Sequence, residues 1–72
     1  MDKAIYTFHH ATQWDDEIIG VVAPDLIQAL EIVNGEIRNI KPEECINYTL
    51  VKDEVQDGIH FHVYIYNPAY EG

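Results

Sequence analysis

The most constraining feature of this 72-residue chain is the strict alternation of residue type over positions 59–66. Isoleucine, phenylalanine and valine occupy the odd positions, while histidines and tyrosines occupy the even ones. Side chains that alternate with a period of two point to opposite faces of a β-strand. The segment is therefore predicted to be a strand with an apolar face for the core and a second, aromatic and titratable face. That second face comprises His60, His62, Tyr64 and Tyr66.

One helix is predicted over residues 25–34. Asp25 stands at the N-cap position, and Gln28 three residues later completes a capping-box pattern. Apolar residues then recur with helical spacing at Leu26, Ala29, Leu30 and Val33. Asn34 and Gly35 are predicted to end the helix, because glycine readily adopts the left-handed conformation of a helix terminus. The alternative, in which Asn34 and Gly35 form a hairpin turn, fits the helical period before them less well.

Three further segments have the β-branched and aromatic composition of strands, namely residues 4–10, 18–23 and 45–51. The Asp-Gly dipeptide at 57–58 predicts a two-residue hairpin turn between the last two strands. Counting outward from that turn pairs Asp53 with His62 and Val51 with Tyr64. The order of elements predicts an α+β fold, a ββαββ two-layer sandwich. Its mainly antiparallel four-stranded sheet carries the helix on one face.

On this register the helix packs against the apolar face of the last strand, and the opposite face stays uncovered. Exposed apolar and aromatic area of this kind indicates an interaction surface. The residues predicted to bind a partner are Val51, Asp53, His60, His62, Tyr64, Tyr66 and Trp14. Trp14 fits equally well as a binding anchor and as a core residue. The occupant of the face is either a protein partner or a second copy of the chain, which would give a homodimer.

The charge balance narrows the class of partner. Thirteen acidic residues against four basic ones give a net charge of −9. Such a chain repels phosphate, which disfavours direct binding of nucleic acid or of an anionic membrane. A basic protein, such as one that binds nucleic acid, is the natural complement. The alternative is that the acidic surface serves only to keep a small protein soluble.

The cellular compartment and the number of domains are predicted from simple features of the chain. No apolar run approaches the roughly 20 residues of a membrane span, and the first residues lack the pattern of a secretory signal. Cys45 is the only cysteine, which is typical of a reducing compartment. We therefore expect one small cytoplasmic domain over residues 1–72.

The sequence gives little support for catalysis or for a bound metal. His60 and His62 have a spacing that can supply two metal ligands, and a pair of histidines at 9–10 can add a third, but no closed ligand set is evident. No cofactor motif is present. Cys45 follows two glutamates, which are expected to raise its pKa and make it a poor nucleophile. The predicted neighbour Asp53 is in turn expected to raise the pKa of His62.

These observations predict a small, acidic, non-enzymatic binding protein that acts by occupying the surface of a protein partner. Its size and charge are typical of viral and mobile-element inhibitors that present carboxylates where the phosphates of DNA would lie. A structural homo-oligomer without an inhibitory role and a histidine-based metal-binding protein are the alternatives.

Overall fold

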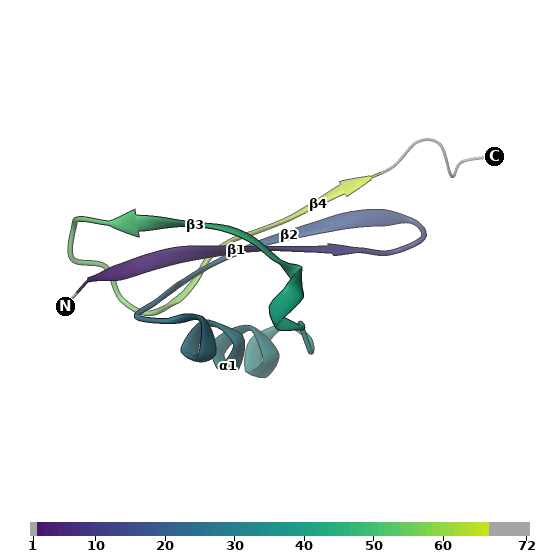
Figure 1. Cartoon of the computed structure of the whole chain (residues 1–72). Coiled ribbons are helices and arrows are strands. Elements are labelled where there is room, and N and C mark those ends of the chain that lie inside the picture. The colour runs from purple at the N-terminus through teal and green to yellow at the C-terminus, as the bar shows by residue number, and fades with distance from the viewer. Residues whose placement is uncertain (1, 67–72) are drawn as a thin grey trace.

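The computed structural model describes residues 2–66, which form one antiparallel sheet with a helix on one side of it (Figure 1). The elements are β1 (Lys3–Ala11), β2 (Asp15–Ala23), α1 (Leu26–Glu36), the short 3-10 helix η1 (Pro42–Glu44), β3 (Cys45–Val51) and β4 (Gly58–Tyr66). The predicted α+β two-layer fold with four strands and one helix is confirmed. Within residues 2–66, no helix is long and apolar enough to cross a membrane.

The predicted hairpin between the last two strands is wrong. The sheet runs β3-β1-β2-β4, so the last two strands lie at opposite edges and form no hairpin. The predicted two-residue turn needs a positive φ at both central positions, and only Gly58 has one, at 146°. Strands β3 and β4 flank the β1–β2 hairpin, so β2 lies inside the sheet. This position agrees with its burial, because β2 is buried along most of its length.

Helix α1 begins as predicted and ends two residues later than predicted. Its N-cap is Asp25, whose carboxylate accepts a hydrogen bond of 2.8 Å from the backbone N–H of Gln28. At the other end, the side-chain oxygen of Asn34 accepts a bond of 2.8 Å from the N–H of Ile40. Asn34 therefore stabilises the chain after the helix, and the helix itself continues to Glu36. The core between α1 and the sheet consists of Phe8, Ile19, Val21, Ala23, Ala29, Val33 and Ile40.

The helix covers only part of its side of the sheet. Its 11 residues extend about 16 Å, whereas the nine residues of β2 or β4 extend about 30 Å. It packs against β2 and β4. The β1–β2 turn and the end of β4 therefore extend beyond the helix (Figure 1). This part of the sheet, residues 9–18 and 62–66, is termed the projecting end.

Candidate binding surface

The alternation along β4 exists as predicted, but its two faces are reversed. His62 pairs with Ile19 and Tyr64 with Glu17, so these two β4 side chains lie on the helix side of the sheet. Val63, which pairs with Ile18, faces the other side. The prediction that the apolar face of this strand packs against the helix is therefore wrong.

A β-bulge in the pairing of β4 explains the reversal. Gly20 pairs with Phe61 and Val21 with Ile59, so His60 is an extra residue in β4. Ile59 packs against the core on the helix side, whereas Phe61 lies on the opposite side. Counting with a period of two places Ile59 and Phe61 on the same face, because such counting cannot detect a bulge.

The structure also shows which tyrosines and histidines of β4 form a continuous surface. His62, Tyr64 and Tyr66 lie on the helix side of the projecting end and are termed the tyrosine row. The helix does not reach this far, and Tyr64 and Tyr66 are 55% and 57% exposed. The rings of His62 and Tyr64 lie 4.9 Å apart between centroids. His60 stands apart from the row at the bulge.

Two carboxylates of β2 accompany the tyrosine row. Tyr64 pairs with Glu17 and Tyr66 with Asp15, and directly paired residues share one side of a sheet. Each exposed tyrosine therefore has an acidic residue beside it on the neighbouring strand. Glu17 is fully buried, so only Asp15, beside Tyr66, offers a partly exposed carboxylate on this surface. The two exposed rings and Asp15 are suited to cationic side chains, which bind the faces of aromatic rings as well as carboxylates.

Glu17 is fully buried and is the residue of this region that the sequence did not reveal. Its Oε2 lies 2.5 Å from Nε2 of His62, and its Oε1 lies 2.9 Å from Nε of Arg38. The contact with Arg38 is an ion pair without hydrogen-bond geometry. A buried carboxylate needs such partners because its desolvation is costly. The predicted strand began after this position, so nothing in the pattern marked Glu17 as part of the sheet.

The predicted pairing of His62 with Asp53 is wrong, and Glu17 takes the place of Asp53. Asp53 follows β3, which lies three strand spacings, about 14 Å, from β4. Val51 belongs to β3 as well. The structure therefore does not bring Val51 or Asp53 to the tyrosine row.

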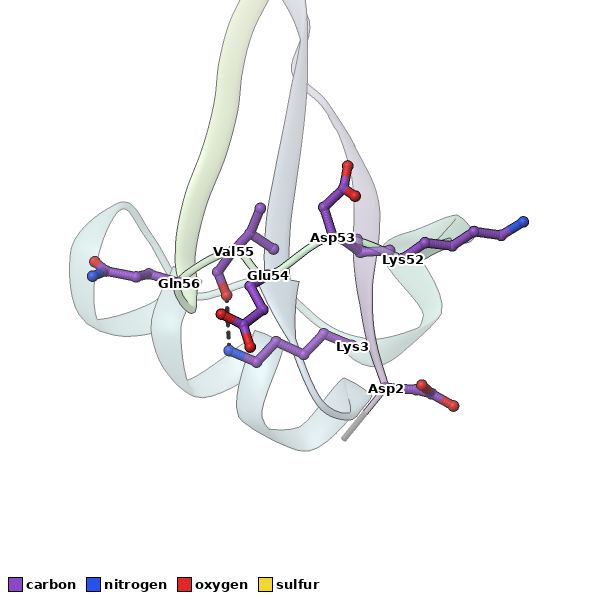
Figure 2. Close-up of a pocket in the computed structure, with 8 residues that line it drawn as sticks. Asp2, Lys3, Lys52, Asp53, Glu54, Val55 and Gln56 are labelled. Atoms are coloured by element: carbon purple, nitrogen blue, oxygen red, sulfur yellow. Dashed lines mark hydrogen bonds between the residues drawn. The ribbon is translucent and has the colours of Figure 1, made fainter.

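Asp53 lines an open recess formed where the β3–β4 connection passes the start of β1 (Figure 2). The recess has a volume of about 670 Å³ and is lined by Asp2, Lys3, Val51, Lys52, Asp53, Glu54, Val55 and Gln56. Lys3 Nζ donates a hydrogen bond of 2.9 Å to the carbonyl of Val55 and forms an ion pair of 2.7 Å with Asp57. The lining of the recess is mostly charged and polar, unlike the apolar lining of most ligand sites. These contacts hold the connection in place.

Trp14 is exposed at the tip of the β1–β2 turn rather than buried in the core. Its side chain is 57% exposed. The hydroxyl of Thr12 accepts hydrogen bonds from the backbone N–H groups of Trp14 and Asp15, at 3.1 and 3.0 Å. Asp15 in turn pairs with Tyr66. Trp14 therefore lies at the same end of the molecule as the tyrosine row, as the anchor interpretation requires.

Two histidines of β1 are held by carboxylates. His9 Nε2 lies 3.1 Å from Asp16, and His10 Nδ1 lies 2.6 Å from Glu44 of η1. Burial raises the pKa of Glu44, but the backbone N–H of Lys41 and the His10 ring outweigh burial, so this pKa lies below its usual value. Among residues 2–66, no three histidine, cysteine or acidic side chains are grouped so as to hold a metal ion.

The thiol of Cys45 has a raised pKa, as predicted, but for a different reason. Burial raises this pKa, and a hydrogen bond from Sγ to the carbonyl of Asn47 (3.6 Å) offsets the effect only in part. The two preceding glutamates are not the cause. A raised pKa lowers the fraction of reactive thiolate at neutral pH.

Comparisons of the chain with protein-family models, with curated proteins and with solved structures gave no match. No functional residue is therefore transferred from a relative. The tyrosine row and Trp14 are the candidate surface on the strength of their exposure and chemistry.

Proposed function

We propose that the protein is a non-enzymatic binding protein that docks on a basic surface of a protein partner. The observation that carries the proposal is the exposure of Tyr64 and Tyr66 on β4, next to the partly exposed Asp15 of β2. Trp14 extends the same surface at the tip of the projecting end. Tyrosine and tryptophan are enriched among the residues that dominate binding energy at interfaces.

The charge distribution supports a cationic partner. Asp15 and Asp16 lie on the projecting end, and the exposed Glu43 lies in η1, next to the Glu44 that contacts β1. Of the four basic residues, Lys3 and Lys52 lie at the opposite end of the sheet, Arg38 is paired with the buried Glu17, and Lys41 is the N-cap residue of η1. Arginine and lysine side chains of a partner would therefore meet aromatic rings and carboxylates together.

An inhibitory role is the specific form of this proposal. If the partner uses its basic surface to bind nucleic acid, docking of this acidic chain would compete with phosphate for the same cations. Viral and mobile-element inhibitors that mimic DNA act in this way. We place the protein in the cytoplasm, where its single thiol would stay reduced.

Capture of the partner at two ionic strengths tests the proposal. The chain, immobilised through its amino terminus, is expected to retain a basic protein from a lysate of the native host at about 0.1 M salt and to release it at about 1 M, because salt screens charge pairs. Added DNA should compete with the captured protein if that protein binds nucleic acid. Capture that is equally strong at both salt concentrations would contradict docking through charge.

A matched pair of tyrosine variants locates the surface. Tyr64→Ala is expected to weaken binding of the captured protein at least about tenfold. Tyr48→Ala is the control, because Tyr48 is similarly exposed, at 62%, but belongs to β3 at the other edge of the sheet. Equal losses in the two variants would show that the tyrosine row is not the binding surface.

A further inference from the structure

We propose that strand β4 pairs edge to edge with β4 of a second copy of the chain, so that the two sheets join into one continuous sheet. β4 is an edge strand, because the strand order is β3-β1-β2-β4. Within residues 2–66, β4 pairs only with β2, and no other backbone hydrogen bond involves it. Its outer edge therefore carries unpaired backbone N–H and C=O groups, which are a template for another strand.

The second half of β4 lacks the devices that normally prevent such pairing. Natural edge strands are protected by charged side chains, prolines or bulges. Residues 61–66 contain no acidic residue, lysine, arginine or proline, and the bulge at His60 lies before them. The β3–β4 connection joins β4 at Gly58, which pairs with the buried Val22, so the connection lies at the other end of the strand. Between 47% and 57% of the residue surface is exposed at Val63, Tyr64, Ile65 and Tyr66.

The other edge strand, β3, is less suited to this pairing. On the open side, which is the side of the sheet opposite α1, β3 presents the polar Asn47 and Thr49. β4 presents apolar residues on the open side and aromatic or histidine rings on the helix side. Cross-strand pairs of aromatic and β-branched side chains stabilise a sheet. Pairing through β4 therefore gains side-chain contacts on both sides of the joined sheet.

The sequence of β4 is self-complementary when a two-fold axis passes through Val63. The backbone groups of alternate residues point outward, so antiparallel copies place odd-numbered residues opposite odd ones and even opposite even. With Val63 opposite itself, Phe61 meets Ile65 of the second copy on the open side, since a two-fold interface contacts itself. On the helix side, His62 meets Tyr64 of the second copy. Each apolar residue of 61–65 thus meets another apolar residue, and the two tyrosine rows become neighbours.

The distribution of charge favours a second copy as the occupant of this edge. The net charge of −9 makes two copies repel each other wherever carboxylates approach. The carboxylates beside residues 64–66 lie on β2, at Asp15, Asp16 and Glu17. In the dimer, two uncharged β4 strands separate the two β2 strands by three strand spacings, about 14 Å. This separation exceeds the screening length of about 8 Å at physiological salt.

The acidic residues of α1 are kept apart as well. The helix stops short of residues 62–66 in each copy (Figure 1). Because the two β4 strands are antiparallel, the two helices lie beyond opposite ends of the paired segment. A strand from a basic partner, by contrast, would find no carboxylate on β4 itself.

Sedimentation equilibrium of the full chain tests the dimer. The paired segment is short, so association is expected between about 10 µM and about 1 mM. Over this range the mass should rise from 8.3 kDa toward twice that value. Added salt should leave this association unchanged or strengthen it, because salt screens the repulsion between acidic copies. Docking on a basic partner has the opposite salt dependence, so failure of one proposal is distinguishable from failure of the other.

A matched pair of lysine variants locates the interface. Val63→Lys is expected to raise the dissociation constant at least about tenfold, because the two-fold axis brings two lysines directly opposite each other. Thr49→Lys is the control, since it makes the same change at a β-branched residue on the open side of the other edge strand. It should leave the dissociation constant within about threefold. Equal losses, or a larger loss in Thr49→Lys, would overturn pairing through β4.

Amide hydrogen exchange of the unmodified chain keeps the test decisive if Val63→Lys fails to fold. Edge pairing protects only the N–H groups that point outward, which belong to alternate residues within 61–66. By NMR, these amides should exchange at least about twofold more slowly at about 1 mM than at about 10 µM. Exchange in β4 that is independent of concentration, or a constant mass of 8.3 kDa up to about 1 mM, would overturn the proposal.

Discussion

At the scale of single residues, a close contact explains why a glycine stands at position 20, which no sequence pattern predicts. Gly20 lies in the middle of β2 with an ordinary negative φ, so no turn requires a glycine there. The ring of Phe61 lies directly over it, and a Cβ at Gly20 would come within 2.1 Å of Cε2 of that ring. Glycine at this position therefore makes room for the phenylalanine of the neighbouring strand.

Gly20→Ala is expected to destabilise the protein by about 1–3 kcal/mol, because the added methyl group displaces the Phe61 ring. In a Phe61→Ala background the same change should be neutral or stabilise by up to about 1 kcal/mol, since alanine restricts the unfolded chain. Urea unfolding of the four chains in this double-mutant cycle measures the difference. An unchanged cost of Gly20→Ala in both backgrounds would show that Phe61 is not the cause.

At the scale of elements, local patterns predicted the strands and the helix but not which strands pair. The composition of residues 45–51 predicted β3 with its observed limits, and Asp25 marked the start of α1. The hairpin between β3 and β4 was wrong because an Asp-Gly dipeptide favours a tight turn only where the two strands are neighbours. The faces of β4 were wrong because the bulge at His60 depends on packing around Gly20 and Phe61.

The same limit applies to the candidate site. The alternation over residues 59–66 correctly predicted that His62, Tyr64 and Tyr66 share one face. Which face this is, and that Glu17 is the partner of His62, depend on the position of β2 beside β4. A single sequence holds no local signal for a pairing between segments so far apart.

The contact between η1 and β1 gives a prediction about pH. Glu44 has a lowered pKa in the folded protein, so its carboxylate contributes stability that is fully present above the usual value of 4.5 and is lost as the pH falls through the lower, folded-state value. Glu44→Gln is therefore expected to lower the free energy of unfolding by about 1 kcal/mol at pH 7. The difference from the unmodified chain should shrink below pH 4.5.

Urea unfolding at a series of pH values measures this difference. Glu43→Gln is the control, because Glu43 is the exposed neighbour of Glu44 in the same short helix. It is expected to change stability by less than about 0.5 kcal/mol at each pH. A loss in Glu44→Gln that stays constant from pH 7 to pH 3 would contradict a role for the charged carboxylate.

At the scale of the whole molecule, the two edge strands connect parts of the chain that are distant in sequence. Lys3 pairs with Val51 and Asp15 with Tyr66, partners that are about fifty residues apart. The central β1–β2 hairpin needs only a short loop. Sheets built from distant segments fold slowly, because the chain loses entropy before the edge contacts form.

We therefore expect folding on the millisecond to second scale, with β1 and β2 formed before β4 joins them. Val21→Ala in β2 should slow folding, with a φ-value of about 0.5 or more, and Ile59→Ala in β4 should mainly speed unfolding, with a φ-value of about 0.3 or less. Val21 and Ile59 are direct partners in the β2–β4 pairing, so their φ-values compare two strands at one place in the sheet. Stopped-flow kinetics at low protein concentration provide both values. A higher φ-value for Ile59 than for Val21 would reverse the expected order.

The sheet also separates the start of β1 from the finish of β4, which lie at opposite ends of it (Figure 1). A fluorophore or affinity handle attached ahead of Lys3 would sit beside the β3–β4 connection, a full strand length from Trp14. The same group attached just after Tyr66 would stand among the exposed rings. Surface immobilisation, labelling and fusion should therefore use the amino-terminal side, so that the aromatic end remains accessible.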